Sequence, residues 1–205
     1  MIDRVRVWCL RHAESEANAK VPGAIEDSGL TQLGRSQAIA AAQRLKAEPI
    51  TRIYSSRALR ARQTAELLAT ALAITRGTPG TPGTPAPSIT AMPELVEVDC
   101  TADALRAWVV ERDLGRRMAD GADGETGQQV VARVTAAFQK IASAHPGETV
   151  AVVGHVASLT VALGRLCSLG SGVWGTPLPH ARPFLVEWDG SAWHCATWPA
   201  MSPVA

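Results

Sequence analysis

The sequence lacks the features of several common protein classes. Its formal net charge is only +1 over 205 residues, so bulk charge does not attract nucleic acid or an anionic membrane. No apolar run approaches the ~20 residues that span a bilayer. The N-terminal stretch MIDRVRVWCLRH contains an acid at position 3 and only a short apolar run, so we expect no signal peptide. We therefore expect a cytoplasmic protein that binds neither nucleic acid nor membrane.

Common cofactor and metal motifs are also missing. There is no G-x4-G-K-[ST] loop for a nucleotide and no G-x-G-x-x-G after a strand for a dinucleotide. The four cysteines stand at positions 9, 100, 167 and 195, with no C-x-x-C pair and no zinc-type spacing. We interpret them as reduced thiols and expect neither a metal nor a cofactor.

What is present fits one globular domain. Apolar residues make up 46% of the chain and the mean hydropathy is near zero, which is typical of a protein with a buried core. The length favours a single domain over residues 1–205. One segment interrupts it: RGTPGTPGTPAPS (76–88) contains three consecutive GTP triplets, and this composition predicts an exposed, flexible loop.

Predicted strands alternate with predicted helices along most of the chain. The strands are expected at 5–10, 51–56, 88–97 and 149–155, with a terminal hairpin at 184–198 around Asp189-Gly190. The helices are expected at 31–47, 60–73, 101–118, 126–145 and 156–167, with Thr31 as one cap and a capping box of Thr126 and Gln129. This alternation predicts an α/β fold with a mostly parallel sheet and helices on both faces.

Charged side chains follow the predicted strands, where ligands bind in such folds. The residues at these four strand ends are Arg11-His12, then Ser55-Ser56 with Arg57, Arg60 and Arg62, then Glu97 and Asp99, and finally Gly154-His155. Arginine guanidinium groups suit phosphate oxygens, a histidine nitrogen is a good nucleophile near neutral pH, and a glutamic acid can protonate a leaving alkoxide. Together they suit phosphoryl transfer through a phosphohistidine without a metal.

Each of these residues also has an ordinary structural explanation. A single histidine after a strand is more often structural than catalytic, and Arg57 and Arg62 fit a solvated helix face. Glu97 alone would carry no information. The coincidence at four strand ends is what favours a site.

Five stretches, in this order, resemble the signature of the histidine phosphatase superfamily, the phosphoglycerate mutase-like branch 1. They are RHAESEAN (11–18), DSGLTQLGRSQA (27–38), YSSRALRARQTAELL (54–68), LVE (95–97) and AVVGH (151–155). The resemblance implies a three-layer α/β/α sandwich with a mostly parallel central sheet. It also implies that His12 is the phosphorylated nucleophile and that Glu97 is the proton donor. The residues implied to bind the phosphoryl group are Arg11, Asn18, Arg60 and His155.

The chain departs from the family pattern at four places. One is the stretch VDCTADA after Glu97, where many relatives have a Gly-x-Trp-Glu-Gly segment that contacts the organic part of the substrate, so the relatives' substrates are not carried over. Ala13 stands where glycine is usual beside the nucleophile, and Arg57-Ala58 replaces Pro-Leu. The segment PHARPF (179–184) stands where many relatives have a small polar turn, so His180 and Arg182, together with Arg57, are candidate substrate contacts. The ordinary alternative for PHARPF is a surface loop.

Other functions remain open from the sequence. Cys100 and Arg106 fit the C-x5-R spacing of cysteine-dependent phosphatases, but TADAL between them contains no glycine and fits a helix start better. Within the family, a mutase typically has extra residues between the acid and the second histidine. Glu97 and His155 are only 58 positions apart, which favours a phosphatase acting on a small phosphorylated metabolite. A catalytically inactive binding module is the third interpretation, and a homodimer is left open.

Overall fold

The computed structural model describes residues 4–76, 85–98, 100–115, 124–175 and 177–199. They form an α/β fold around one six-stranded sheet with the strand order β3-β2-β4-β1-β5-β6. The strands are β1 (Val5–Arg11), β2 (Arg52–Ser55), β3 (Ser88–Ala91), β4 (Thr149–Gly154), β5 (Phe184–Trp188) and β6 (Trp193–Cys195).

The four strands β3, β2, β4 and β1 run parallel, while β5 and β6 add an antiparallel edge beside β1. The mostly parallel sheet is therefore confirmed, and so is the terminal hairpin. In the central pair, Arg11 of β1 lies opposite Gly154 of β4. Because both strands end at the same level, His12 and His155 emerge side by side at one edge of the sheet.

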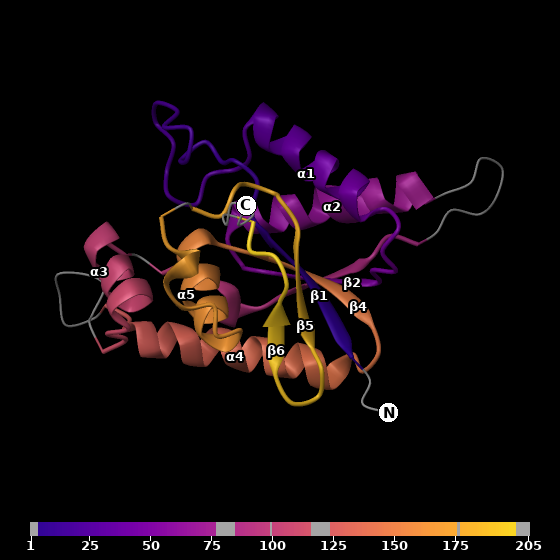
Figure 1. Ribbon diagram of the computed structural model, residues 1–205. Helices are drawn as coiled ribbons and strands as arrows, with labels where there is room; N and C mark the ends of the chain where they lie inside the picture. Colours follow the sequence, from indigo (N-terminus) through magenta and orange to yellow (C-terminus); the bar gives the residue numbers. More distant parts are fainter. Residues whose placement is uncertain (1–3, 77–84, 99, 116–123, 176, 200–205) are drawn as a thin grey trace, which may run out of the picture.

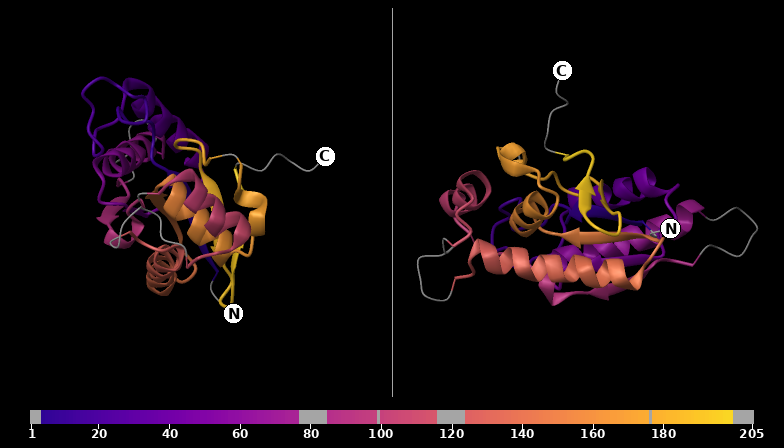
Figure 2. Two further views of the ribbon diagram at one scale, coloured as in Figure 1. Left: turned by 90° about the vertical axis from the view of Figure 1, so that its left-hand side faces the viewer. Right: turned by 60° about the horizontal axis from the view of Figure 1, so that its bottom comes forward.

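Helices cover both faces of the sheet, as Figure 1 shows. Helices α1 and α2 lie together on one face, and α4 and α5 lie on the other. The helices are α1 (Gln32–Leu45), α2 (Leu59–Arg76), α3 (Ala102–Arg106), α4 (Gly127–Ala144) and α5 (Val156–Leu166), with 3-10 turns η1 (Pro93–Leu95) and η3 (Gly170–Val173) and a π-helical turn η2 (Ala107–Glu111). Figure 2 shows α3 at the same end of the molecule as α5, with the C-terminal end of α2 at the opposite end.

The alternation of side chains along the central strands divides the core into two apolar clusters. In β1, Val5, Val7 and Cys9 pack on the side of α4 and α5, while Leu10 packs on the side of α1 and α2. Both clusters are buried, so neither face of the central strands is left to solvent. A strand that is covered on both faces has apolar side chains at nearly every position, which explains the continuous apolar sequence of residues 149–154.

The predicted helix starts are confirmed at two places. The Thr31 hydroxyl accepts a hydrogen bond from the Gly34 amide at 2.9 Å and caps α1. Thr126 and Gln129 form the reciprocal capping box at the start of α4. These contacts satisfy amide groups that a helix leaves unpaired in its first turn.

The strand expected within 88–97 covers Ser88–Ala91, because Pro93 has no N–H to donate to a sheet ladder and begins η1 instead. One predicted helix is shorter in the structure. The helix expected at 101–118 changes to the π-helical turn at Ala107 and ends at Arg112, whose backbone is left-handed with φ 59°. Periodicity alone does not signal a π-turn.

Some of the predictions concern residues that the structure does not describe. Of the predicted loop 76–88, residues 77–84 lie outside the described ranges, as do residues 116–118 of the predicted helix. The single domain over 1–205 stays a prediction. Within the described residues, no helix is both long and apolar enough to cross a membrane.

Gly34 lets α1 approach the loop that follows β1. A Cβ atom at this position would lie 2.0 Å from the main-chain oxygen of Glu14. The same loop is attached to α1 by the Gln37 side chain, whose oxygen accepts from the Glu14 amide at 2.9 Å. The helix and the His12 loop are therefore positioned by backbone contact, and neither can move without the other.

We expect Gly34→Ala to destabilise the protein by about 1–3 kcal/mol, because a methyl group there must displace backbone. The measurement is the free energy of unfolding in urea. Gly115→Ala is the matched control, since its Cβ would meet only the Asp113 side chain, at 3.5 Å. Equal stabilities of the two variants would contradict this role of Gly34.

Candidate active site

The imidazole of His12 is held in one tautomer. Its Nδ1 lies 2.7 Å from the main-chain oxygen of Ala13. A carbonyl oxygen can only accept, so Nδ1 carries the hydrogen and the lone pair is at Nε2. The Arg60 Nε–H donates to this Nε2 at 3.3 Å. A buried histidine therefore presents a nucleophilic nitrogen beside a permanent cation.

The main chain of the same loop is fixed on several sides. The His12 amide donates to the Gly154 oxygen at 2.8 Å, and the Ala13 amide donates to the Thr64 hydroxyl at 3.0 Å. Ala13 itself is fully buried in the apolar cluster beneath α1 and α2. Its methyl group thus packs into the core, and its φ is not positive, so alanine fits where relatives have glycine.

His155 lies next to His12, and both rings are buried. Their centroids are 5.1 Å apart, and His155 Nε2 is 2.7 Å from the Ser56 hydroxyl. Burial lowers the pKa of His12 to about 2, with a further contribution from His155. Burial and the charge of Arg60 lower the pKa of His155 to about 3. Both rings are therefore neutral near pH 7.

Two arginines bring positive charge to this edge of the sheet. Arg60 is buried, and its Nη1 donates to the Glu26 main-chain oxygen at 2.9 Å. Arg11 donates from Nη1 to the Leu178 oxygen at 3.0 Å, and burial lowers its pKa. Six buried side-chain polar atoms of the described residues have no hydrogen-bond partner, and four of them lie near the strand ends: Arg11 Nε, Ser55 Oγ, His155 Nδ1 and Ser158 Oγ. The other two are the indole nitrogens of Trp8 and Trp198. Unsatisfied groups beside two cations suit an anionic ligand.

The Glu97 side chain lies at the N-terminus of α5, the helix that begins directly after His155. Its two carboxylate oxygens accept from the amides of Ala157 (3.2 Å) and Ser158 (2.9 Å). These contacts place a carboxyl group from the end of the η1 segment beside the second histidine. The structure thus brings together Arg11, His12, Arg60, Glu97 and His155, which come from four separate segments.

His180 also reaches the site. Its Nδ1 is 2.9 Å from the main-chain oxygen of His12, and its ring centroid lies 5.5 Å from that of His12. His180 thus lies beside His12, while a contact of His180 with a substrate stays a prediction. His12, His155 and His180 form what we call the histidine cluster.

The three other predicted site residues are exposed. Asn18 accepts from the Ser15 hydroxyl at 2.9 Å through its side-chain oxygen. Arg57 and Arg182 point into solvent, with Arg57 near enough to Glu94 to lower the pKa of that carboxyl slightly, after the larger effect of Lys140. Contacts of these three residues with a substrate stay predictions.

The sequence did not indicate the roles of two supporting residues, Thr64 and Ser56, although Ser56 stands at a predicted strand end. Thr64 holds the Ala13 amide and also donates to the Arg60 main-chain oxygen at 2.7 Å, which connects the nucleophile loop to α2. Ser56 contacts His155. Both residues lie inside the segment 54–68 that resembles the family signature. The signature indicates that the segment belongs to the site, but it does not indicate which group each hydroxyl contacts.

The C-x5-R alternative is not supported by geometry. Thr101 accepts from the Ala104 amide and begins α3, so residues 102–106 form a helix rather than a phosphate-binding loop. Arg106 is exposed and pairs with Glu111. The interpretation of this segment as a helix start is confirmed.

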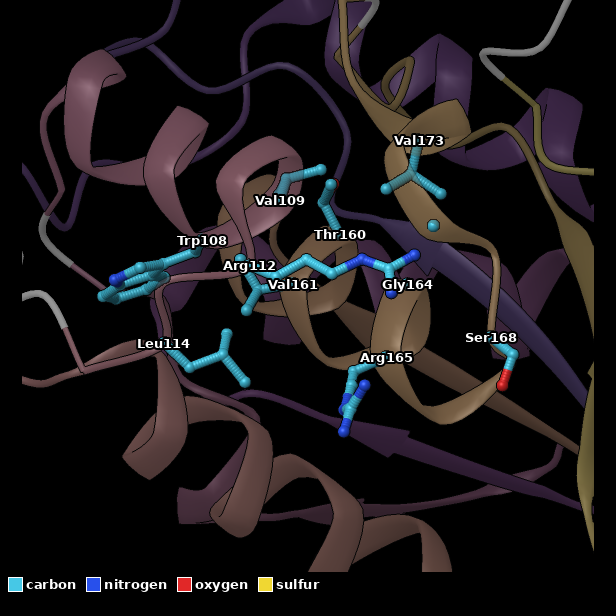
Figure 3. Close-up of a pocket in the computed structure, with 11 residues that line it drawn as sticks. Trp108, Val109, Arg112, Leu114, Thr160, Val161, Gly164, Arg165, Ser168 and Val173 are labelled. Atoms are coloured by element: carbon cyan, nitrogen blue, oxygen red, sulfur yellow. The ribbon is translucent and has the colours of Figure 1, made fainter.

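A separate cavity of about 340 Å³ lies between η2, the C-terminal half of α5 and η3 (Figure 3). Arg112 and Arg165 bring guanidinium groups to it, and Trp108 and Val173 contribute apolar surface. None of His12, His155 and His180 lines this cavity. It is therefore distinct from the histidine cluster.

No cluster of three histidine, cysteine, aspartate or glutamate side chains within the described ranges could hold a metal ion. All four cysteines are described, and none forms a disulfide.

Comparison with known proteins points to one family. The model of the histidine phosphatase superfamily (branch 1) matches residues 7–200. The "Probable phosphoglycerate mutase GpmB" of Escherichia coli is 29% identical over 204 residues, covering 95% of this chain and 90% of that protein.

Solved structures share the fold. Bacillus stearothermophilus YhfR superposes with a TM-score of 0.71 at 26% identity, covering 97% of this chain and 98% of that one. A mycobacterial glucosyl-3-phosphoglycerate phosphatase superposes with a TM-score of 0.63 at 22% identity, covering 95% of this chain and 99% of that one. The latter likeness concerns the fold alone.

We expect the protein to lose stability as the pH falls below about 6.5. His12 and His155 titrate near that pH when unfolded but at about 2 and about 3 when folded, so the unfolded chain binds more protons in between. Each histidine then reduces the free energy of unfolding by up to about 1.4 kcal/mol per pH unit. The measurement is urea unfolding between pH 4 and pH 8.

The variants His12→Asn and His155→Asn isolate these contributions from those of other groups. Each is expected to show a shallower loss of stability with acid than the unmodified protein, whatever its stability at pH 8. A slope unchanged in both variants would show that the rings are not held neutral.

Proposed function

Because the chain belongs to the histidine phosphatase superfamily (branch 1), we propose that it hydrolyses a small phosphorylated metabolite through a phosphohistidine on His12. The observation that carries the proposal is the hydrogen bond from His12 Nδ1 to the Ala13 oxygen. It places the lone pair at Nε2, which accepts from Arg60 in the structure. A phosphoryl group bound there would take over this guanidinium and leave the lone pair free for attack on phosphorus.

The first step breaks the ester bond. His12 Nε2 donates its lone pair to phosphorus, the bond to the alcohol oxygen breaks, and Glu97 gives its proton to that oxygen. Arg11, Arg60 and His155 contact the phosphoryl oxygens, where negative charge is stabilised by preorganised donors. His155 can donate to an oxygen without being charged, because a neutral imidazole retains one N–H.

The second step returns the enzyme to its starting state. Water attacks the phosphorus of the phosphohistidine, Glu97 takes a proton from that water, and His12 leaves as a neutral imidazole. The low pKa of His12 supports this step, because a neutral ring is restored without further proton transfer. Phosphate is the product.

A mutase is the second candidate, because the E. coli relative is named as a phosphoglycerate mutase. The short span between Glu97 and His155 favours a phosphatase, since a mutase must shield its phosphoenzyme from water. Phosphoryl transfer between the 2- and 3-positions of glycerate, with no phosphate released, would identify the mutase.

We expect the purified protein to release phosphate from p-nitrophenyl phosphate at an undiminished rate in the presence of EDTA. The proposed nucleophile, acid and cations are all side chains, so chelation removes nothing that the reaction uses. The measurement is phosphate release with and without chelator. Activity lost on chelation and restored by a metal would contradict the proposal.

Glu97→Gln is the informative variant in the same assay. The amide keeps an oxygen that can accept from α5 but has no proton to transfer. Hydrolysis of alkyl phosphates should slow by about 10²–10⁴-fold, and that of p-nitrophenyl phosphate by much less, because its leaving group needs no proton. Equal losses with both substrates would argue against the acid role.

A further inference from the structure

The segment Leu178–Ala181 is attached to the end of β1 beside the nucleophile. The Ala181 amide donates to the Arg11 oxygen at 3.0 Å, and the Arg11 guanidinium donates to the Leu178 oxygen at 3.0 Å. The His180 contact with the His12 oxygen, at 2.9 Å, is the third. Three hydrogen bonds across more than 160 positions of sequence thus fix where the His180 side chain lies.

The contact with His12 also fixes the tautomer of His180. The main-chain oxygen of His12 can only accept, so His180 Nδ1 carries the hydrogen and Nε2 carries a lone pair. Burial, with the nearby charge of Arg11, lowers the pKa of His180, which keeps this lone pair unprotonated near pH 7. Within the described residues Nε2 has no hydrogen-bond partner, and it is not among the buried unpaired atoms, so it is open to solvent.

The peptide between His12 and Ala13 is held from both sides. His180 binds its oxygen, and Thr64 binds its N–H at 3.0 Å. With the ring centroids of His12 and His180 only 5.5 Å apart, the free edge of His180 has little freedom relative to the nucleophile. His180 therefore stands beside the residue proposed to take the phosphoryl group, close enough for the organic part of a bound phosphate ester to reach it.

The backbone next to His180 is strained. Ala181 has φ 48°, in the left-handed region, which costs an alanine of order 1–2 kcal/mol. Such conformations persist where the surrounding contacts enforce them, and they occur preferentially at functional sites. Here the enforcing contacts are the hydrogen bonds that place His180.

We propose that His180 is a specificity-determining residue: its Nε2 accepts a hydrogen bond from a hydroxyl group of the leaving alcohol, so the site prefers phosphate esters of polyols. This inference rests on the proposed phosphatase function. If the leaving alcohol carried a carboxylate in that position, a carboxylate oxygen and Nε2 would face each other, and both can only accept. If it carried a simple alkyl chain, Nε2 would have no hydrogen-bond partner.

The test compares glycerol 1-phosphate with n-propyl phosphate, which has the same carbon chain without the free hydroxyls. The wild-type kcat/KM is expected to be at least tenfold higher for glycerol 1-phosphate. 3-Phosphoglycerate, which carries a carboxylate, should be hydrolysed less efficiently than glycerol 1-phosphate.

Two variants separate the two nitrogens of His180. In His180→Asn the amide nitrogen stands as many bonds from Cβ as Nδ1 and can still donate to His12, but nothing replaces Nε2. We expect the ratio of kcat/KM for glycerol 1-phosphate to kcat/KM for n-propyl phosphate to fall about tenfold, because the hydrogen bond to the leaving alcohol is lost. In His180→Gln the amide oxygen can replace Nε2 and the contact with His12 is lost, so the preference should survive while turnover of all substrates falls.

His194→Asn is the matched control, an exposed histidine of β6 whose Nε2 contacts Asp189 at 2.7 Å. It should retain the wild-type preference and turnover. A preference ratio unchanged in His180→Asn would overturn the inference while leaving the phosphatase function standing. Absence of p-nitrophenyl phosphate hydrolysis by the wild-type protein would instead reject the proposed function itself.

Discussion

The hydrogen bond from His12 Nδ1 to the Ala13 oxygen is the constraint on which the site depends. This contact with the main chain of the next residue fixes the orientation of the imidazole ring and determines that Nε2 carries the lone pair. Nε2 then faces Arg60. Much of the neighbouring structure serves this contact. Thr64 and His180 hold the peptide between His12 and Ala13, and Gly34 lets α1 pack directly on the next residue of the loop.

The electrostatics follow from placing neutral rings beside permanent cations. Burial disfavours the charged form of an imidazole, and Arg11 and Arg60 disfavour it further, so His12 and His155 stay neutral where free histidine would begin to protonate. A dianionic phosphoryl group would find arginines for charge and histidines for hydrogen bonding and attack. The same arrangement is expected to destabilise the fold in acid, so the neutral ring proposed as the nucleophile and the predicted acid sensitivity have one physical origin.

Much of the fold could be predicted because its signals are local. The apolar run at 149–154, the cap at Thr31 and the capping box at Thr126 depend on neighbours in sequence, and parallel strands necessarily bring Arg11-His12 and Gly154-His155 to one edge. What could not be predicted depends on contacts between distant segments. The pairing of His180 with the His12 oxygen joins positions 168 apart, and no periodicity encodes it.

The same reasoning explains the errors in detail. The π-helical turn η2 (Ala107–Glu111) and the left-handed Arg112 arise where the chain after α3 packs against α5 and η3, so tertiary packing overrides a helical pattern. The hydroxyl groups of Thr64 and Ser56 belong to the segment 54–68, which matches the family signature, but a sequence motif does not indicate which groups its side chains contact. The sequence thus predicted which side chains lie together at this edge of the sheet, but not the contacts that orient them.

The position of the phosphoryl group on the trapped intermediate tests the central claim most directly. The protein, labelled with ¹⁵N-histidine, is mixed with substrate and quenched in alkali, and ¹⁵N and ³¹P NMR identify the phosphorylated nitrogen. The expected result is a single phosphohistidine at Nε2 of His12 that is absent from His12→Asn. Phosphorylation at Nδ1, or on any other residue, would contradict the role assigned to the hydrogen bond between His12 and Ala13.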